Sequence, residues 1–541
     1  MQTYLNTQAL GRFESRNTGV QLGYTTTLSF PNLPSMSWNS TDWLTVNFYD
    51  DYSAGSFFGT PYGQRDNSQD NLFAAGSNTT YPYPQTVTEV NTTRGNPTIS
   101  ISRILGSTGS VYHVNFYDSR NRVVQTKTFN NTAATDVAST QYSFDGKPLR
   151  TVYHHQKNGT NAQTHTVITK INYDAGGRLW TIYKNIDSAP SDQLISTNTY
   201  NELGQLQNKE LGNNLDNLNY VYNIRGWLTS INKNFIAGTP GNYFGMELGY
   251  DKAASAASNT SYTNLQYNGN IAGTVWKTAG DGVGRKYDFT YDNVNRLTGA
   301  DFNQDAGSGF NKSAGLDFSV SNLTYDGNGN IISMNQMGYK VGGSSLVDQL
   351  KYRYQLNSNK LLEVNDTAND ATTKLGDFHD GSNTLGTDDY VYDVNGNLTL
   401  DNNKAISGII YNYLNLPQQV TVTSKGTVYY TYDAAGTKLY KTTVDSTTTP
   451  SKTTVTMYQG PFVYQNDTLQ FASHEEGRAR WAFHKYTTGS SAYGFEYDFF
   501  EKDHLGNTRV VLSQEKDTAK YLASGEAAYR TTEAQLFNNC I

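Results

Sequence analysis

Three closely spaced segments, YDVNGNL (392–398), YNYLNLP (411–417) and YDAAGTKL (432–439), share one pattern. Each follows an alternation of aromatic residues, such as Tyr390 and Tyr392, which has the period of a strand with one buried face. The Asp or Asn and the Gly that follow are turn residues, because they accept local hydrogen bonds and tolerate positive φ. The next apolar residue, such as Leu398 or Leu439, begins another strand. Each segment therefore predicts the corner of a β-hairpin.

The same pattern recurs from residue 111 onward. Further copies are YDSRNRV (117–123), YDAGGRL (173–179), YNELGQL (200–206), YNIRGWL (222–228), YDNVNRL (291–297) and YDGNGNI (325–331), with weaker relatives that start at Tyr142 and Tyr354. A step of roughly 20 residues between copies corresponds to two strands and two turns, or one hairpin per repeat. Longer steps contain Gly/Asn/Ser-rich stretches, such as 251–274 and 365–388, which predict insertions in loops.

A single hairpin cannot bury its aromatic face, so successive hairpins must pack side by side into a long curling sheet. In that sheet the tyrosines would form ladders across neighbouring strands. The predicted fold class is therefore all-β, a spiralling sheet of repeated hairpins. The residues that define the repeat are Tyr117, Asp118, Tyr173, Asp174, Gly177, Tyr291, Asp292, Tyr325, Asp326, Gly329, Tyr392, Asp393, Gly396, Tyr432, Asp433 and Gly436.

The composition supports an all-β class and argues against several functions. Hydrophobic residues make up 36% and charged residues 16%, as in some disordered chains, but 41 Tyr and 23 Phe supply the buried surface that disordered chains lack. A net charge of −7 without a basic stripe argues against nucleic acid as a partner. The single cysteine, Cys540, excludes an intramolecular disulfide and a cysteine zinc site. The sequence contains no run of 18 apolar residues, so it predicts no membrane-spanning helix.

The sequence divides into four predicted regions. Residues 1–110 form an irregular N-terminal β region, 111–455 the hairpin array, 456–513 a second β region, and 514–541 a helical or linker tail rich in Glu, Ala, Lys and Gln. The start, MQTYLNTQAL, lacks the features of a signal peptide, and the end, FNNCI, has no closing strand. We therefore expect the sequence to be a piece of a longer protein.

The spaced Tyr-Asp-x-x-Gly-x-Leu units resemble the YD repeats of the RHS family. Two segments, PFVYQNDTLQFASHEEGR (461–478) and YDFFEKDHLGNTRVVLS (497–513), resemble the RHS core-associated region of Bacteroidetes-type members. The upstream segments WLTVNFYDD (43–51) and VYHVNFYDSRNRVVQT (111–126) resemble the N-terminal part of the same proteins. The core-associated motif comprises Asp503, His504, Leu505, Gly506, Asn507 and Arg509.

This resemblance implies a β-strand spiral that wraps into a hollow shell. In the family the shell encloses a C-terminal toxin, delivered by secretion systems, or serves surface adhesion. The implied partners are thus an enclosed toxin or C-terminal cargo polypeptide and secretion machinery, and the parent protein is expected to be secreted or on the cell surface. The aspartyl self-cleavage motif usual in toxin-bearing members is not visible, so autoproteolysis is not carried over. We predict a non-enzymatic shell without a cofactor. The alternative is a recognition module that binds glycans or proteins through exposed loops such as 251–274.

Each candidate metal or nucleotide site is better explained by an ordinary structural role, such as a turn. The D-x-N-x-N spacing of Asp326, Asn328 and Asn330, and of Asp393, Asn395 and Asn397, matches the first half of a calcium loop. The Gly at position six and the Glu at position twelve are missing, so turns are expected there. GDGVGR (280–285) has no strand before it and no helix after it, and His154 with His155 has no third ligand at a usable spacing.

A weaker third hypothesis is a hydrolase that uses His504 or Glu476. Asp503 precedes His504, and His474 precedes Glu475 and Glu476, but adjacent residues on a strand point to opposite faces. We therefore expect His504 to pack at a hairpin corner and the two glutamates to lie in a solvated turn.

Overall fold

A computed structural model of the protein describes residues 44–53, 63–340, 342–368, 377–380, 385–484 and 492–515. The regular structure there is antiparallel β, apart from helix α2 (Lys233–Ile236) and a 3-10 turn at Asp70–Leu72. The prediction of an all-β fold built from repeated hairpins is confirmed. The strand expected within 24–30, most of the 514–541 tail and Cys540 lie outside the described residues.

The strands fall into two hydrogen-bonded sheets. The first part of the first sheet comprises β1 (Thr45–Asp50), β2 (Thr93–Arg103), β3 (Ser110–Tyr117), β4 (Val123–Phe129), β5 (Thr135–Tyr142), β6 (Pro148–Lys157), β7 (Gln163–Tyr173), β8 (Leu179–Ile186), β9 (Gln193–Tyr200), β10 (Leu206–Leu211), β11 (Asp216–Tyr222) and β12 (Leu228–Ile231). It continues through β13 (Phe244–Gly249), β14 (Gly273–Thr278), β15 (Arg285–Tyr291), β16 (Leu297–Asp305), β17 (Phe310–Asn311), β18 (Val320–Tyr325), β19 (Ile331–Lys340), β20 (Gly343–Tyr354) and β21 (Leu361–Asp366). The second sheet comprises β22 (Tyr390–Tyr392), β23 (Leu398–Asp401), β24 (Ile406–Tyr411), β25 (Pro417–Val422), β26 (Gly426–Tyr432), β27 (Lys438–Asp445), β28 (Lys452–Gln459), β29 (Phe462–Gln465), β30 (Thr468–His474), β31 (Gly477–His484), β32 (Ala492–Lys502) and β33 (Thr508–Ser513).

Each strand pairs with the next one along the chain, apart from the short β17, which lies beside β16, and the step from β21 to β22. The sheet runs through the predicted region boundary at 110, because β2 pairs with β3 across it. Residue 455 lies inside β28. The division into four regions stays a prediction from composition.

A β-bulge marks the tyrosine that begins each corner. Asn172 pairs with Thr181 but the next residue, Tyr173, pairs with Leu179, so the register shifts at the tyrosine. The same shift occurs at the tyrosines numbered 117, 142, 222, 291, 325, 354, 392, 411 and 432. A bulge bends its strand and increases the local twist. Further register shifts lie elsewhere, as between Ser321 and Thr324, but a shift recurs at the corner end of these hairpins and gives the sheet a repeated bend.

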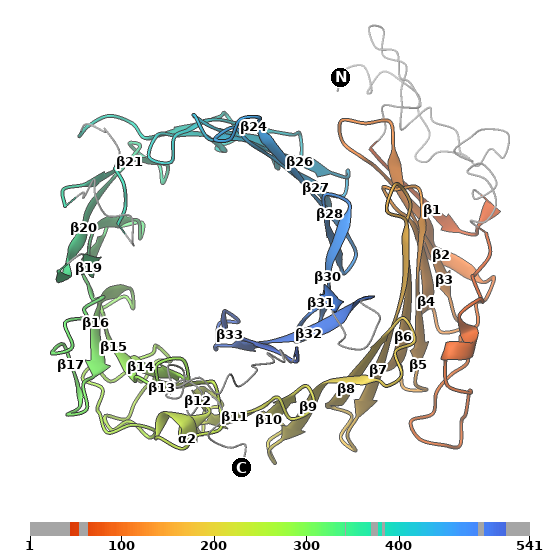
Figure 1. Cartoon of the computed structure of the whole chain (residues 1–541), viewed down its shortest axis with the longest axis horizontal. Coiled ribbons are helices and arrows are strands. Elements are labelled where there is room, and N and C mark those ends of the chain that lie inside the picture. Colours follow the sequence, from red (N-terminus) through yellow and green to blue (C-terminus); the bar gives the residue numbers. More distant parts are fainter. Residues whose placement is uncertain are drawn as a thin grey trace, which may run out of the picture.

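The bent sheet closes into a ring whose end lies inside its beginning (Figure 1). The chain runs from β1–β9 through β10–β21 and β24–β26, and then passes inside its own first strands as β28–β33. No described strand runs through the middle of the ring in this view. The wall is therefore double where the two ends overlap and single elsewhere.

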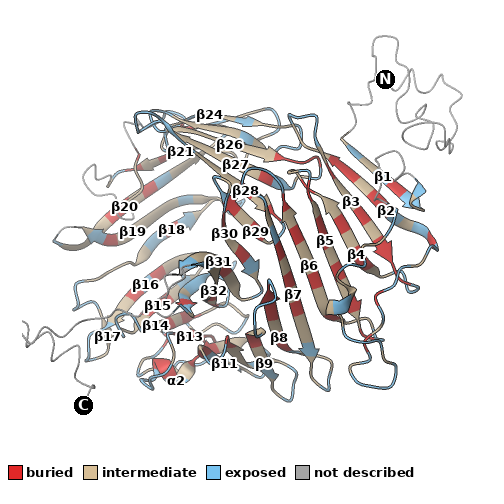
Figure 2. Ribbon diagram, turned by 45° about the vertical axis from the view of Figure 1, so that its right-hand side comes forward, coloured by how far each residue is buried: buried red, intermediate tan, exposed pale blue. Residues whose placement is uncertain are grey.

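Burial follows this layering (Figure 2). In the overlap most residues of β8 are buried, and Phe462 and Tyr464 of β29 are 0% exposed. In the single wall, strands such as β18 and β25 consist mostly of half-buried and exposed residues. The largest amount of apolar surface is thus removed from water at the overlap, where burial stabilises folding most.

A second covering lies on the outside of the first strands. Residues 63–90 cross the outer face of β2–β6, where the side chain of Gln125 donates to the backbone of Asp66 and that of Gln141 donates to the backbone of Ala74. Beneath them Phe48, Ile99 and Phe116 form part of a buried cluster. This part of the irregular N-terminal region is therefore tied down on the sheet.

Candidate functional site: the corners, the seam and the rim

The corner of each repeat is held by its second residue. At Asp118, Oδ1 accepts hydrogen bonds from the backbone N of Arg120 (2.8 Å) and Arg122 (3.0 Å), and Oδ2 accepts one from Arg122 Nε (2.7 Å). Asp174 with Arg178 and Asp292 with Arg296 repeat this geometry, with the same 2.7 Å contact between the arginine Nε and Oδ2. A charged acceptor of several donors makes a strong, local turn.

The fifth residue of the corner has a left-handed backbone. Gly177 has φ +75° and Asn121, at the same place in its repeat, has φ +59°. These are the residue types that adopt this conformation at least cost, which explains why the position is Gly or Asn.

The tyrosine of each repeat binds the preceding repeat. Tyr325 Oη donates to the carbonyl of Leu297 (2.6 Å), which is the last residue of the previous corner, and Tyr411 Oη donates to that of Leu398 (2.8 Å). The tyrosines numbered 142, 173, 200, 354 and 392 make the same bond to residues 123, 148, 179, 331 and 361. In several copies a cation of the earlier corner also covers the ring, as Arg178 covers Tyr200 at 4.6 Å. The repeat-defining residues therefore link neighbouring hairpins along one rim.

The two calcium-like segments are corners of this kind. Asp326 Oδ1 accepts from the backbone N of Asn328 and Asn330, and Oδ2 accepts from Asn330 Nδ2 (2.8 Å). In the other segment, hydrogen bonds from the side chain and backbone of Asn397 lower the pKa of Asp393. The carboxylate oxygens are thus already used by the turn itself.

The core-associated motif is a further corner. Asp503 accepts from the backbone N of Leu505 and Asn507 (2.9 Å each) and from Arg509 Nε (2.8 Å). His504 and Leu505 lie exposed at its tip. Asp503 therefore accepts hydrogen bonds from its own turn, as the aspartates of the repeats do. The turn at Gly506 and Asn507 joins β32 to β33.

The remaining sequence candidates have other roles. GDGVGR (280–285) is the turn between β14 and β15, where Arg285 pairs with Asp281. The expectation that no strand precedes it is therefore wrong, but a strand and not a helix follows it, so it is not a nucleotide loop. His154 Nδ1 contacts Thr166 Oγ1 at 2.9 Å, and His155 points into the seam described next. The two histidines therefore face opposite sides of β6, as alternation along a strand requires.

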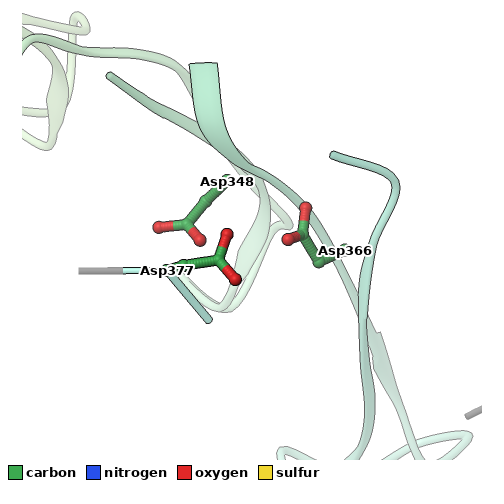
Figure 3. A group of neighbouring side chains, drawn as sticks. All are labelled: Asp348, Asp366 and Asp377. Atoms are coloured by element: carbon green, nitrogen blue, oxygen red, sulfur yellow. The ribbon is translucent and has the colours of Figure 1, made fainter. Parts of the chain in front are cut away.

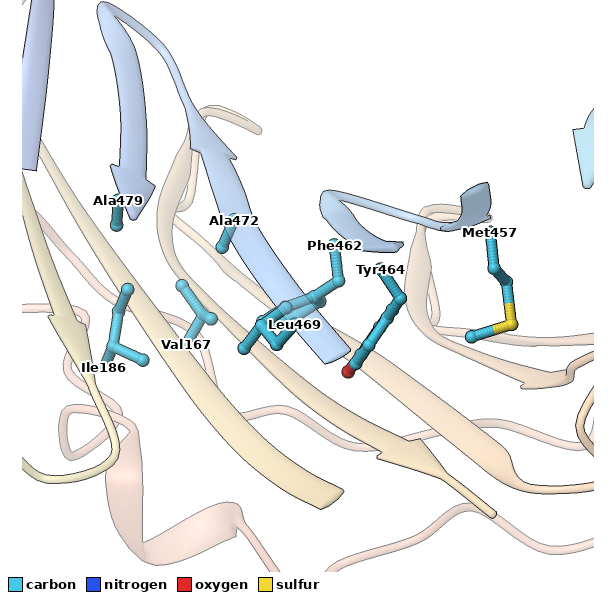
Figure 4. Close-up of a cluster of buried hydrophobic side chains, with 8 residues drawn as sticks. All are labelled: Val167, Ile186, Met457, Phe462, Tyr464, Leu469, Ala472 and Ala479. Atoms are coloured by element: carbon cyan, nitrogen blue, oxygen red, sulfur yellow. The ribbon is translucent and has the colours of Figure 1, made fainter. Parts of the chain in front are cut away.

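The overlap of the two ends, which we call the seam, is apolar at its centre. Val167 and Ile186 of the first strands face Phe462, Tyr464 and Leu469 of the inner strands (Figure 4). A second cluster continues the seam between β8–β11 and β32–β33, and consists of Ile182, Ile195, Leu211, Leu218, Phe499 and Leu512. Sequence reasoning noted apolar alternation after residue 455 but did not predict which strands it covers.

A buried polar chain crosses the seam beside these clusters. His155 Nδ1 lies 2.8 Å from Asp136 Oδ1, and His155 Nε2 lies 2.8 Å from the hydroxyl of Tyr464. The three side chains are at most 3% exposed, and residues 155 and 464 are 309 positions apart in the sequence. Both ring nitrogens of His155 are thus satisfied within the seam, so this series of hydrogen-bonded side chains fixes the position of one layer on the other.

Ion pairs join the layers at the margin of the seam. Lys157 binds Asp467 at 2.5 Å and Lys209 binds Glu476 at 2.6 Å. Lys184 binds Glu475 at 3.2 Å. The expected turn at Glu475 and Glu476 is present and Glu475 is exposed, but Glu476 is half-buried and both glutamates also pair with lysines of the outer layer.

His474 and Glu476 do not form an acid–base pair. The imidazole of His474 accepts the backbone N–H of Glu476 at 3.2 Å and packs against the rings of Tyr497 and Phe499. Burial, and next the charge of Lys184, lowers the pKa of His474 to about 4.

A buried acid pair lies at the end of the seam. Glu501 of β32 is 0% exposed and Asp216 of β11 is 5% exposed. Burial, and next the neighbouring Asp216, raises the pKa of Glu501 to about 9. The glutamic acid is therefore protonated at neutral pH, and its neutral form is the one that the seam accommodates.

The insertion 251–274, expected to be exposed, is partly buried. The carboxylate of Glu247 accepts hydrogen bonds from the backbone N of Ala256 (3.0 Å) and Ala257 (2.8 Å) and from the hydroxyl of Tyr262 (3.2 Å). The Tyr262 ring, 3% exposed, lies against the paired glycines 249 and 273. The insertion is thus fastened to β13 and β14.

The rim formed by the corners is apolar at its tips. One exposed apolar side chain stands at most corners, each more than half exposed: Phe144, Leu203, Ile224, Val294, Leu356, Val394, Tyr413 and Leu505. In the described turns of the opposite rim, the exposed large apolar residues are Tyr243 and Leu385. The two rims of the wall therefore differ in character.

Within the described ranges, a corner of one rim contacts a turn of the other. The backbone N of Leu105, in the turn between β2 and β3, donates to the carbonyl of Tyr432 (2.9 Å), and that of Ala434 donates to Arg103 (2.7 Å). These bonds set a corner of the second sheet on the opposite rim of the first, beside a groove lined in part by Leu44, Leu105 and Tyr413. No helix in the described part of the chain has the length and apolar character needed to span a membrane.

Comparison with known proteins gives similarities of fold only. No family model and no curated protein matches the sequence. The structure is similar to a TcdB2–TccC3 complex without its hypervariable C-terminal region, at 13% identity over 79% of this chain and 23% of that one, with a TM-score of 0.45. It is also similar to a Tc holotoxin pore of Photorhabdus luminescens with a substituted TccC3, at 11% identity over 77% and 26% of the two chains, with a TM-score of 0.26. The chain spans about a quarter of the length of these solved structures, and the similarity at this level assigns it no activity.

Proposed function

We propose that this chain is part of the wall of an RHS-type shell that encloses a polypeptide and catalyses no reaction. The observation that carries the proposal is the closure of the hairpin wall on itself. A curved single sheet separates an inside from an outside only where its ends are joined, and here they overlap and are held by apolar clusters and ion pairs. The YD repeats that resemble the RHS family are the residues that build this wall.

The inner surface of the seam suits a polypeptide that must later be released. On β31 and β32, Ala479 and Phe499 face the outer layer, so Arg478, Arg480 and Asp498 face the middle of the ring. Asp498 Oδ2 accepts from Arg478 Nε (2.9 Å) and Arg480 Nε (2.7 Å). The same face also carries Val511, which is 52% exposed, so the paired charges reduce the apolar area offered to an enclosed chain without removing it.

The absence of catalysis is proposed from the use of the candidate groups. Glu476 is paired with Lys209 across the seam, and Asp503 is saturated by its own turn. His504 lies exposed at a corner tip. A hydrolase would instead require turnover that is lost in His504→Ala, and we expect no such turnover against peptide, ester or glycoside substrates.

Limited proteolysis of the product of the complete parent reading frame tests the enclosure. We expect the polypeptide encoded next to the wall to resist protease in the intact protein and to be digested when it is produced alone. Lys209→Glu, which sets two negative charges together at the seam, should increase its digestion, whereas Lys312→Glu in the single wall should not. Equal digestion of the neighbouring polypeptide with and without the wall would refute the proposal.

The location of the parent protein follows from the same proposal. A shell that delivers a polypeptide acts outside the cell that makes it, so we propose that the parent is exported or displayed on the cell surface by secretion machinery. Detection of the intact parent in the medium or in a surface-protease assay supports this, and its confinement to the cytoplasm of actively growing and competing cells contradicts it.

A second candidate function, binding of another protein, is favoured by the apolar tips of the corner rim. The partner that fits is the opposite rim of another hairpin wall, because the corner at Tyr432 already docks on such a rim within the molecule. A second copy supplies this rim. We expect light scattering to show concentration-dependent association that Ile224→Asp with Val394→Asp abolishes. Tyr429→Asp, which changes an exposed aromatic residue within strand β26 away from both rims, should leave the association unchanged. A strictly monomeric protein at all concentrations would exclude this second function.

A further inference from the structure

Three buried carboxylates converge where the first sheet gives way to the second (Figure 3). Asp348 lies on β20, Asp366 ends β21, and Asp377 lies in the connection to β22. One carboxylate oxygen from each lies within 4.8 Å of the others. Asp348 is 3% and Asp366 4% exposed, and the side chain of Asp377 is 0% exposed.

The protein satisfies these carboxylates only in part. Asp366 Oδ1 accepts from the backbone N of Gln349 (2.7 Å) and Ala368 (3.0 Å), and Asp348 Oδ1 accepts from that of Phe378 (2.7 Å). Asp366 Oδ2 is buried and has no hydrogen-bond partner among the described residues. Its carboxylate points toward the other two (Figure 3).

Positive charge near the cluster is limited. Among the described residues, His379 Nδ1 lies 3.3 Å from Asp377 Oδ2, and Lys340 acts on Asp348 from a distance. Burial, and also the charges of Asp366 and Asp377, raises the pKa of Asp348. Carboxylates this deeply buried need a cation or a proton, because an uncompensated charge in the protein interior is costly.

We propose that Asp348, Asp366 and Asp377 bind a calcium ion. Oxygen ligands lie at 2.3–2.6 Å from calcium, so two ligands of one ion are at most about 5 Å apart. The three carboxylate oxygens lie within 4.8 Å of one another, which fits a common centre. Carboxylate oxygens are ligands of hard cations, and calcium accepts the irregular geometry of ligands from two strands and a connection more readily than magnesium.

The ion would act at the break in the wall. Within the described residues no strand pairing joins β21 to β22. The junction includes Asp389, whose backbone N donates to Leu362 and whose side chain accepts from the backbone N of Val364, and the bond from Tyr392 to Leu361. A calcium ion shared by β20, β21 and the connection would fix the connection on the first sheet. The inference is independent of what the wall encloses.

Calorimetric titration of the full chain, freed of metal with EDTA and dialysed, tests the site with calcium chloride. We expect one site per chain and a melting temperature that rises with calcium. Asp348→Asn and Asp366→Asn should each weaken binding at least about tenfold. Asp301→Asn, which removes an exposed carboxylate elsewhere in the sheet, should bind calcium as the parent chain does.

The stability of the asparagine variants separates a metal site from a structural cluster. In EDTA, Asp348→Asn removes a repulsive charge, so its melting temperature should equal or exceed that of the parent chain. In the presence of calcium, the parent chain should have a higher melting temperature than Asp348→Asn. Absence of calcium binding, unchanged binding in both asparagine variants, or equally tight binding of magnesium chloride would overturn the assignment.

Discussion

The buried acid at the seam predicts a specific pH dependence of stability. Glu501 faces Asp216 across the two layers, and its pKa in the folded protein is raised to about 9 from an ordinary value of 4.5. At any pH between these two values, Glu501 is protonated in the folded protein and ionised in the unfolded chain. The stabilising contribution of this proton is complete below the ordinary pKa and is lost as pH rises toward the raised one. Glu501→Gln replaces the acid with a side chain of the same shape that is neutral at all pH.

The size of the effect follows from linkage. One proton taken up on folding lowers the free energy of unfolding by about 1.4 kcal/mol for each pH unit. From the ordinary pKa of 4.5 to pH 7.5 the loss in the parent chain is about 4 kcal/mol, an upper bound that assumes full release on unfolding. Glu501→Gln should lack this loss, because its amide is neutral at every pH in this range. We therefore expect the variant to be more stable than the parent at pH 7.5, with a gain that shrinks as pH falls.

Urea unfolding across this pH range, followed by tryptophan emission, measures the difference, because Trp481 packs in the seam. Glu202→Gln, which changes an exposed glutamate at a corner, is the matched control and should leave the pH dependence unchanged. If the stability difference between Glu501→Gln and the parent is the same at every pH, the seam holds no extra proton and the reasoning is wrong.

Three further predictions concern the corners and the fastened insertion. Tyr325→Phe removes the hydrogen bond to Leu297 and should lower the free energy of unfolding by about 1 kcal/mol in urea titration, and no change would mean that the tyrosine bond does not join the repeats. Gly177→Ala places a side chain at φ +75° and should cost about 1–2 kcal/mol in the same assay, and a neutral result would contradict the left-handed corner. Gly273→Ala sets a Cβ 2.5 Å from the Tyr262 ring, so we expect a loss of about 1–3 kcal/mol and faster proteolysis within 251–274, and an insertion cleaved equally in both proteins would show that the ring does not fasten it.

The corners were predictable from sequence because their interactions are local. Asp118 and Arg122 are four residues apart, and the turn that they form depends on nothing distant. The hydroxyl of Tyr325 reaches 28 residues back, one repeat away, so the repeat spacing contains that contact although no single copy does. The bulge at each tyrosine was missed, because an alternating pattern does not reveal an extra residue in one of two paired strands.

The seam was not predictable in detail because its partners are hundreds of residues apart. Nothing near His155 indicates Tyr464, and an exposed turn was the ordinary expectation for Glu475 and Glu476. One signal was available for Glu501. It follows Tyr497 and Phe499 at spacings of two, so alternation places it on the same buried face as these aromatics. An acid in such a position indicates a partner or a raised pKa.

The insertions show a similar limit. Low apolar content in 251–274 suggested an exposed loop, but Glu247 supplies acceptors that bring its backbone onto the sheet. The acidic stretch 365–388 was read as another loop, and only the folded chain brings Asp348 beside Asp366 and Asp377. Composition predicts that such segments form insertions between strands. It does not predict which distant strands they contact.

Carbodiimide cross-linking with mass spectrometry tests the central claim that the wall ends inside its own beginning. The reagent joins an ammonium and a carboxylate only when they touch, as Lys209 and Glu476 do at 2.6 Å although they are 267 residues apart. We predict cross-linked peptides for this pair and for Lys157 with Asp467, together with the local pair Lys312 and Asp317. Recovery of the local pair without either seam pair would show that the two ends of the wall do not overlap.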